Sequence, residues 1–85
     1  MRSTGREDDL LAEEARRIFR AEMERRGYTF KQLAERLAEN TDGEAEEVQA
    51  LINKVSRGRF TFAFFIRAMR AMGVTVVGIS PVDLA

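Results

Sequence analysis

The stretch that decides the fold runs from Glu46 to Gly58 and reads Glu-Glu-Val-Gln-Ala-Leu-Ile-Asn-Lys-Val-Ser-Arg-Gly. Its larger apolar residues recur at i, i+3, i+4 and i+7, so they share one stripe of a helix. These residues are Val48, Leu51, Ile52 and Val55. The pattern predicts a helix over residues 44–57 with one side to bury.

The other side of this helix carries amide, methyl, ammonium and guanidinium groups. They belong to Gln49, Ala50, Asn53, Lys54 and Arg57. Such groups contact base edges and phosphates in a DNA major groove. We therefore expect a helix that reads DNA, and the alternative is an ordinary solvated polar face.

Length and composition limit the possible functions. The chain has 85 residues, 45% of them apolar, which is enough for one small domain with one core. It has no Cys and no His, so it lacks disulfides, thiol nucleophiles, the commonest general base and the commonest metal ligands. We expect no enzyme, no catalytic residues, no metal site and no cofactor.

The ends of the chain carry no targeting signal. The first nine residues contain no apolar segment typical of a secretory signal, and no apolar run is long enough to cross a membrane. We expect a disordered arm over residues 1–9, a domain over 10–79 and a tail over 80–85. The expected location is the cytoplasm, in association with the nucleoid if the protein binds DNA.

Charge is unevenly distributed along the chain. Residues 1–47 hold nine Lys/Arg and thirteen Asp/Glu, a net charge of −4, whereas residues 48–85 hold five and one, a net charge of +4. A basic half can provide an anion-binding face on a neutral protein. Complementarity between the two halves of one fold is the alternative.

Two further helices precede this stretch. The first is expected over residues 10–26, with Gly27 as its C-terminal cap. Glu22 lies beside its apolar stripe, and its expected partner is an Arg or a helix N-terminus. That stripe comprises Leu11, Ala15, Ile18, Phe19 and Met23. The second is expected over residues 30–40, where Thr29 and Gln32 form a capping box. A polar turn then leads to the helix over 44–57.

A fourth helix is expected to begin after Thr61, its N-cap, and to end at Gly73. The expected buried stripe of this helix comprises Phe62, Phe65, Ile66 and Met69. A second apolar strip comprises Phe64, Ala68 and Ala71. This strip either packs against the first helix or forms a dimer surface anchored by Phe64.

The segment over residues 74–79 is short and β-branched, which predicts a strand. One strand cannot satisfy its backbone hydrogen bonds alone, so the same strand of a second subunit is the expected mate. The expected dimer interface comprises Phe64, Ala68, Val74, Val76, Val77 and Ile79. The expected fold class is all-α, a four-helix helix-turn-helix domain with one short C-terminal β-strand pairing across a dimer.

The chain resembles the Cro and lambda-repressor-like helix-turn-helix family, also called the xenobiotic-response-element family. Residues 27–37 resemble its motif G-hydrophobic-T/S-Q-x-x-L-A-x-x-L, and residues 52–59 its motif I-S-x-hydrophobic-E-x-G-K/R. Residues 66–74 resemble its helix ending A-x-x-L-G-V. The chain looks closer still to a group of short uncharacterised bacterial domains containing N-K-x-S-R-G-x-F-[ST].

The resemblance implies a small dimeric protein that binds double-stranded DNA, a bacterial transcriptional regulator whose third helix enters the major groove. Gln49 would read a base, and Asn53 and Lys54 would face the DNA. Arg57 and Arg59 would contact phosphates. The family's phosphate-binding Gln is Phe30 here, so Lys31 or Gln32 would have to replace it. The expected DNA-binding residues are Gln49, Ala50, Asn53, Lys54, Arg57, Arg59 and Lys31.

A protein-interaction module on the same scaffold is the alternative function, for instance an accessory subunit or an antitoxin-like protein. Glu44, Glu46 and Glu47 crowd the N-terminal end of the third helix, where like charge opposes DNA phosphates. A partner would then bind this acidic turn or the strip around Phe64.

Overall fold

The computed structural model describes residues 2–40 and 47–79, and of residues 2–6 and 40 the backbone alone. It contains four helices: α1 (Arg2–Arg26), α2 (Phe30–Asn40), α3 (Val48–Arg57) and α4 (Phe62–Ala71). No strand occurs within the described ranges. The expected all-α class with four helices is confirmed.

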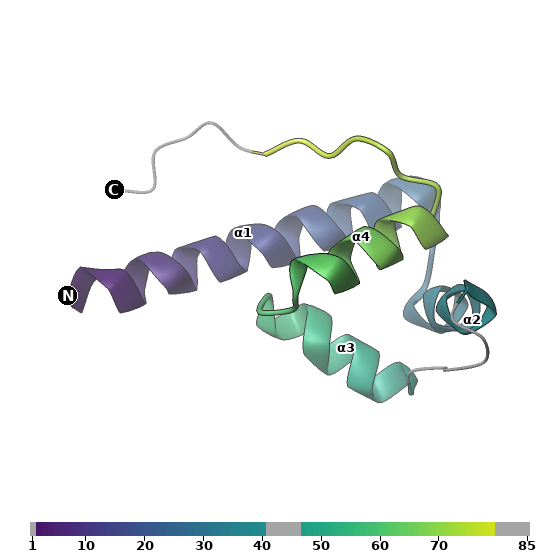
Figure 1. Ribbon diagram of the computed structural model, residues 1–85, viewed down its shortest axis with the longest axis horizontal. Helices are drawn as coiled ribbons and strands as arrows, with labels where there is room; N and C mark the ends of the chain where they lie inside the picture. The colour runs from purple at the N-terminus through teal and green to yellow at the C-terminus, as the bar shows by residue number, and fades with distance from the viewer. Residues whose placement is uncertain (1, 41–46, 80–85) are drawn as a thin grey trace.

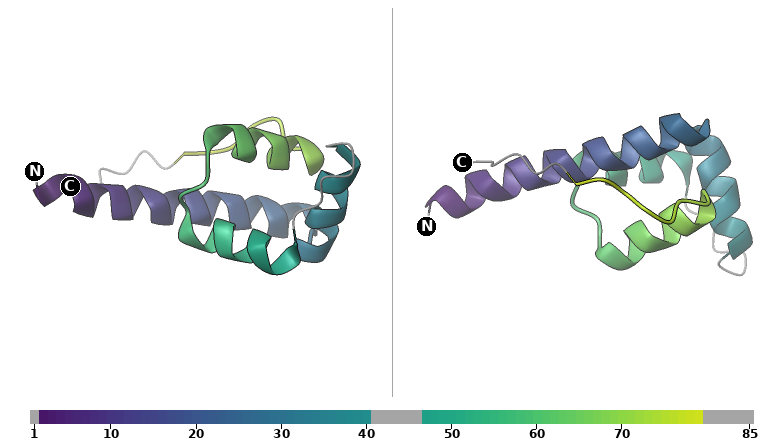
Figure 2. Two further views of the ribbon diagram at one scale, coloured as in Figure 1. Left: turned by 60° about the horizontal axis from the view of Figure 1, so that its bottom comes forward. Right: turned by 90° about the horizontal axis from the view of Figure 1, so that it is seen from above.

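The longest helix organises the molecule. α1 has 25 residues and is therefore about 37 Å long. The other three helices gather around its C-terminal half, while its N-terminal half projects beyond them (Figures 1 and 2). α3 packs against α1, and α2 packs against both α3 and α4.

An aromatic cluster forms the centre of the core. Phe19 of α1 is fully buried, and its ring lies 5.4 Å from the Phe60 ring, 6.0 Å from the Phe64 ring and 6.1 Å from the Phe65 ring, between centroids. These separations are typical of favourable aromatic pairs. Phe19 therefore joins α1 to α4 and to the connection that precedes it.

The first helix begins at Arg2 rather than at Leu10, so residues 2–9, expected as a disordered arm, continue the helix. No proline interrupts this stretch, and adding residues to an existing helix costs far less than starting one. Leu11 is 49% exposed, whereas Ile18, Phe19 and Met23 are buried as expected.

The expected partner of the buried acidic residue is present. Glu22 is 3% exposed, and its Oε2 accepts a hydrogen bond from Arg25 Nη1 at 2.5 Å. A buried carboxylate without a partner would cost much more than it contributes, so this ion pair makes the position tolerable. It is a structural role, as the sequence predicts.

The expected cap of α2 is confirmed in both directions. The Thr29 N–H donates to Gln32 Oε1 at 2.9 Å, and the Gln32 N–H donates to Thr29 Oγ1 at 3.1 Å. This capping box gives hydrogen-bond partners to two backbone N–H groups, that of Thr29 at the N-cap and that of Gln32 in the first turn. Further along α2, Arg36 Nε donates to the Ala71 carbonyl at 3.2 Å and so links α2 to the C-terminus of α4.

The third helix begins at Val48 rather than at residue 44, and Glu44 and Glu46 lie outside the described residues. Within the expected stripe, Leu51 and Val55 are fully buried, Ile52 is half-buried and Val48 is 37% exposed. The expected stripe is therefore correct except at Val48, the first residue of α3.

The expected start of α4 is confirmed, and its expected buried stripe is correct at Met69, half-buried at Phe65 and wrong at Phe62 and Ile66. Thr61 Oγ1 accepts a hydrogen bond from the Phe64 N–H at 3.0 Å. Phe62 is 74% exposed and Ile66 is 39% exposed, whereas Phe64, Ala68 and Ala71 are buried. The small alanines let α4 approach its neighbours closely, so the face that carries them turns inward.

Three expected dimer residues are part of the core of one chain, namely Phe64, Ala68 and Val74. Phe64 is 3% exposed and Ala68 is fully buried, so neither is available to a second subunit. The interpretation in which this strip packs within the domain is correct, and the ring of Phe64 stacks on Phe19 of α1.

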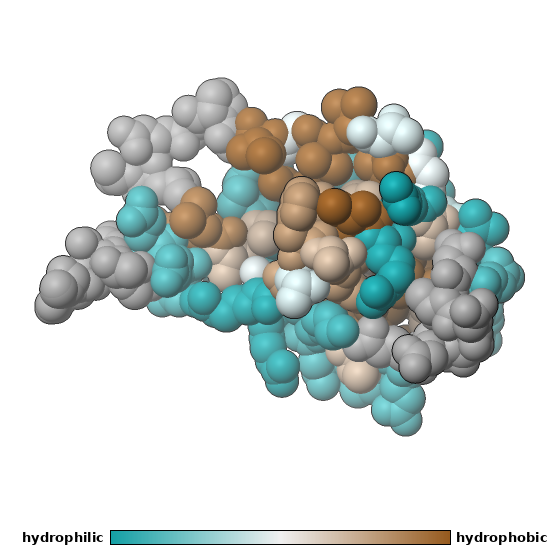
Figure 3. All heavy atoms as spheres, viewed as in Figure 1, coloured by the Kyte–Doolittle hydropathy of each residue, from teal (hydrophilic) through white to brown (hydrophobic). Residues whose placement is uncertain are grey.

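The segment after α4 is not a strand within this chain. Gly73 turns the chain at a φ of 78°, and residues 74–79 then run back along the molecule as a drawn-out segment (Figure 1). Val74 is anchored, because it is 5% exposed and its N–H donates to the Met69 carbonyl at 2.8 Å. Val77 is half-buried, whereas Val76 is 80% and Ile79 is 73% exposed. Brown, hydrophobic side chains gather over α4 and this segment in Figure 3.

Candidate nucleic-acid interface

The polar side of α3 is presented to solvent. Gln49, Ala50, Asn53 and Arg57 are exposed, and Lys54 is half-buried. The opposite side is held by Leu51 and Val55, which are both fully buried. The exposure expected from helical periodicity is therefore observed for four of these five residues, and Lys54 is the exception.

A glycine fixes the C-terminal end of α3 against α1. Gly58 adopts a left-handed conformation, with φ of 67°, and its N–H donates to the Val55 carbonyl at 3.0 Å. A Cβ at this position would lie 2.0 Å from the Ala12 carbonyl oxygen. Only glycine allows the two backbones to come this close. The rotation of α3, and thus the direction of its polar side, depends on this contact.

A side-chain hydrogen bond supports the same arrangement. Arg20 Nη2 of α1 donates to Ser56 Oγ of α3 at 3.1 Å. Arg20 also lies over the Phe30 ring, with 6.0 Å between its Cζ and the ring centroid. Phe30, which occupies the position of the family's phosphate-binding Gln, is half-buried and packs against the core.

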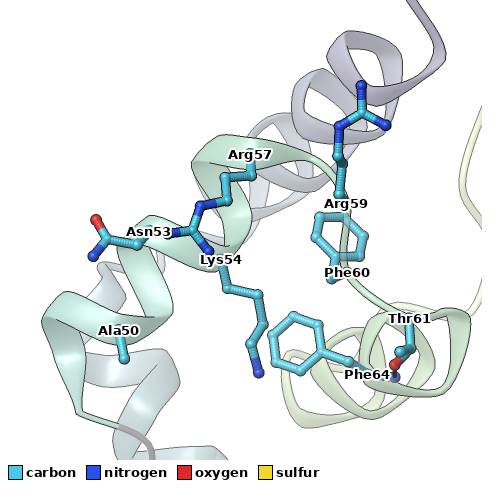
Figure 4. Close-up of a pocket in the computed structure, with 8 residues that line it drawn as sticks. All are labelled: Ala50, Asn53, Lys54, Arg57, Arg59, Phe60, Thr61 and Phe64. Atoms are coloured by element: carbon cyan, nitrogen blue, oxygen red, sulfur yellow. Dashed lines mark hydrogen bonds between the residues drawn. The ribbon is translucent and has the colours of Figure 1, made fainter. Parts of the chain in front are cut away.

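A shallow groove of about 450 Å³ runs between α3 and the start of α4 (Figure 4). Four of its lining residues were expected to contact DNA from α3, namely Ala50, Asn53, Lys54 and Arg57. The others are Arg59, Phe60, Thr61 and Phe64. The groove thus combines three cations, one amide and two aromatic rings. We call it the α3–α4 groove.

The ammonium group of Lys54 is held inside the groove by an aromatic ring. Its Nζ lies 4.5 Å from the centroid of the Phe64 ring, toward which the side chain extends (Figure 4). Arg67 lies near the same ring, with its Cζ 5.8 Å from the centroid. A cation over a ring face is attracted by the ring quadrupole. Phe64 therefore positions a basic group, which differs from the dimer contact expected for it.

The second arginine of the motif is engaged with α1. Arg59 points away from Lys54 toward α1 (Figure 4), and its Nη2 donates to a carboxylate oxygen of Asp9. Both side chains remain largely exposed, at 51% and 75%. Arg59 was expected to contact phosphate, and in this structure an acidic group of the chain itself occupies that place.

The amides of α3 form a pair. Gln49 Nε2 donates to Asn53 Oδ1 at 3.1 Å, one helical turn away. This bond leaves Gln49 Oε1, one hydrogen of the Gln49 amide and both hydrogens of the Asn53 amide for other partners. Lys31 is exposed on α2 and does not line the α3–α4 groove, so the structure does not bring it together with the other six expected residues.

Three participants were not expected from the sequence. Phe60 and Thr61 line the groove, and Asp9 pairs with Arg59. The first two belong to the same N-K-x-S-R-G-x-F-[ST] motif as the basic residues, which could have indicated them. Asp9 is 50 positions from Arg59, and no local pattern links the two.

No other constellation with recognisable chemistry occurs in the described part of the chain. It holds no group of three His, Cys, Asp or Glu side chains that could bind a metal ion. None of its described helices has the length and apolar character needed to cross a bilayer.

On α1, outside the groove, hydrogen bonds from Arg17 to Glu14 and the charge of that carboxylate raise the pKa of Arg17.

Fold and site together define a small four-helix domain with one exposed polar helix beside a basic groove. Residues 11–77 match the model of a family described as Domain of unknown function (DUF6471), so the chain belongs to that family. The match includes α2, α3, α4 and the α3–α4 groove, but not Asp9. No curated protein and no solved structure matches the chain significantly.

Proposed function

We propose that this protein binds double-stranded DNA as a bacterial transcriptional regulator. In this proposal α2 and α3 act as a helix-turn-helix, α3 enters the major groove, and two copies pair through residues 74–79. The packing of α2 against α3 and the resemblance of both helices to the Cro and lambda-repressor-like family support this arrangement.

The observation that carries the proposal is the division of α3 into two sides. Leu51 and Val55 are fully buried, while Gln49, Asn53 and Arg57 are exposed on the other side. A solvated helix face needs no particular chemistry, but this one places two paired amides next to a groove lined by three cations. Amides can read adenine, and cations beside them can hold the phosphates on either side.

Acidic groups near the same face would limit the affinity. Glu47 is exposed directly before the first residue of α3, the end that would approach the groove. Like-charge contact with phosphate opposes the gain from counterion release. The exposure of Glu47 favours the second candidate function, a protein-interaction module, in which a basic partner would bind this end of α3.

Removal of Arg57 tests the DNA proposal. Anisotropy of a labelled mixed-sequence duplex, measured at ~50 and ~200 mM salt, should show roughly tenfold weaker binding by Arg57→Ala at the lower salt. The slope of log affinity against log salt should fall by about 0.9, since one phosphate contact is lost. Arg26→Ala removes the same charge from the exposed end of α1 and should bind like the wild type.

Two outcomes would contradict the proposal. If the wild-type protein does not bind the duplex at ~50 mM salt, the acidic end of α3 dominates and the protein-interaction function replaces the DNA function. If Arg57→Ala and Arg26→Ala weaken binding equally, DNA is held by general charge and not by the α3–α4 groove.

The contact between Asp9 and Arg59 makes a prediction of opposite sign. Asp9→Asn removes the carboxylate that engages Arg59, so the affinity for the duplex should rise by roughly tenfold, the effect of one additional phosphate contact. Glu13→Gln removes a charge from an exposed position of the same helix and should change the affinity much less.

A double-mutant cycle measures whether the effect acts through Arg59. In an Arg59→Ala background, Asp9→Asn should no longer increase affinity, because the cation that it releases is absent. An equal increase in both backgrounds would show that Asp9 acts only through the overall field of the protein and does not compete for Arg59.

A further inference from the structure

The outer face of the molecule carries an apolar surface that the core does not use. Phe62 and Ile66 of α4 are 74% and 39% exposed, and Val76 and Ile79 of the C-terminal segment are 80% and 73% exposed. These four make up two thirds of the six large hydrophobic side chains that are exposed in the described chain. Hydrophobic side chains of α4 and the C-terminal segment gather in one region, brown in Figure 3. We call it the α4 outer surface.

A groove makes this surface continuous. It has a volume of about 300 Å³ and lies between α4 and the C-terminal segment. Phe65, Ile66, Met69 and Arg70 of α4 line it together with Val74, Thr75 and Val77 of the segment. Phe65 in turn stacks with the exposed Phe62 ring, at 6.3 Å between centroids. Helix and segment therefore share one mostly apolar surface, which also includes Arg70 and Thr75.

The backbone of the C-terminal segment, like its exposed side chains, makes few contacts with the rest of the described chain. After the bond from Val74 to Met69, no backbone hydrogen bond joins residues 75–79 to any other described residue. These residues carry no charge and include three β-branched side chains before Gly78. An uncharged, β-branched segment with free N–H and C=O groups is a template for strand pairing.

We propose that a second copy of this chain covers the α4 outer surface, with the two C-terminal segments paired antiparallel about a twofold axis and the Phe62 and Ile66 side chains buried between the two α4 helices. The inference extends the homodimer of the proposed function from the segment to α4, and it does not depend on DNA binding.

A second copy fits this surface because the surface is complementary to itself. A twofold pair of segments supplies each with the donors and acceptors that it lacks, and the same rotation brings the apolar face of each α4 toward the other subunit. Of the expected dimer residues, Val76, Val77 and Ile79 remain. Phe62 and Ile66 take the places that Phe64 and Ala68 were expected to fill.

Two substitutions on α4 test the helical part of the interface. Phe62→Ser and Ile66→Ser should each raise the dimer dissociation constant roughly a hundredfold, since both subunits lose the same buried side chain. Size-exclusion chromatography with light scattering, run over a range of concentrations, measures this constant. Both side chains are exposed in the single chain, so the helical circular dichroism signal should stay unchanged.

Leu11→Ser is the matched control. Leu11 is 49% exposed on α1, outside the α4 outer surface, and its loss should leave the dimer intact. If Phe62→Ser and Ile66→Ser leave the dimer as stable as Leu11→Ser does, the helical part of the proposal is wrong.

Single cysteines test the pairing of the segments. The chain contains no Cys, so a disulfide formed by one introduced Cys must join two copies. In Thr75→Cys, Val76→Cys, Val77→Cys and Gly78→Cys, oxidation should give covalent dimer efficiently at the position nearest the twofold axis, where the Cβ atoms come within bonding range. Glu35→Cys, on the exposed side of α2, should give none.

The possible results distinguish a failure of the dimer proposal from a failure of the DNA-binding proposal. A wild-type protein that is monomeric at high concentration, with no cross-link above that of Glu35→Cys, would overturn the dimer whatever the duplex titration shows. A dimer that binds no DNA would support this inference and contradict the proposed function. If the segment cross-links but Phe62→Ser and Ile66→Ser leave the dimer dissociation constant unchanged, the interface is restricted to the segment.

Discussion

Gly58→Ala should lower the free energy of unfolding of the domain by roughly 2–6 kcal/mol. A non-glycine residue in the left-handed conformation costs roughly 1–3 kcal/mol, and overpacking against a fixed backbone costs roughly another 1–3 kcal/mol. The second cost arises because the new Cβ would lie 2.0 Å from the Ala12 carbonyl oxygen. A domain of 85 residues has a free energy of unfolding of about 4–13 kcal/mol, so the substitution removes a large share of it.

The matched control is Gly27→Ala. Gly27 has a similar φ, 72°, but a Cβ there would meet no heavy atom within 4 Å. Only the conformational cost then applies, roughly 1–3 kcal/mol. Urea denaturation followed by circular dichroism measures both free energies of unfolding. Equal losses in the two variants would mean that α3 does not rest on α1 at Ala12, and the orientation of the polar side of α3 would need another cause.

Phe19→Ala should lower the free energy of unfolding by about 3–5 kcal/mol, the range for large aromatic side chains removed from a core. Phe19 is fully buried and its ring contacts those of Phe60, Phe64 and Phe65. Loss of the ring opens a cavity at the place where α1, α4 and the connection between α3 and α4 meet. The α3–α4 groove should lose its shape as well, because Phe60 and Phe64 line it.

Phe62→Ala is the matched control for this effect. The same atoms are removed from a side chain that is 74% exposed, so the free energy of unfolding should change by no more than about 0.5 kcal/mol. Urea denaturation at a protein concentration low enough for the monomer compares the two directly. A loss in Phe62→Ala as large as that in Phe19→Ala would show that α4 turns its Phe62 face inward in solution.

Local rules recovered the parts of the fold that neighbouring residues determine. The caps at Thr29 and Thr61 rest on side chains that reach backbone groups three residues away, and both are present. The pairing of Glu22 follows from the cost of burying a charge, and Arg25 supplies the partner one turn along. The polar side of α3 follows from its helical periodicity.

The failure on α4 has a clear physical cause. This helix has two apolar stripes, one through Phe62 and Ile66 and one through Phe64 and Ala68, so periodicity alone cannot choose between them. The choice depends on how closely the neighbouring helices approach, which is a property of the whole fold. The stripe with small residues is buried, and the bulkier Phe62 remains outside.

The contacts within the candidate site also could not be predicted from local sequence patterns. Six of the seven expected DNA-binding residues lie on or next to the α3 face, but their expected roles in DNA binding remain predictions. The pairing of Arg59 with Asp9 and the cation–π contact between Lys54 and Phe64 join residues from different helices. Contacts of this kind depend on tertiary packing and have no signature in a single sequence.

The ion pair between Asp9 and Arg59 has a thermodynamic consequence for the proposed DNA binding. Salt weakens the attraction of Arg59 for phosphate, but it also screens the exposed carboxylate that competes for the same guanidinium. The two effects partly cancel, so the apparent number of ions released on binding should be smaller than the number of cations on the surface. Asp9 lies ahead of the segment 11–77 that defines the family. Relatives that share the α3 face could therefore keep the same sequence preference and differ in affinity through the residues that precede it.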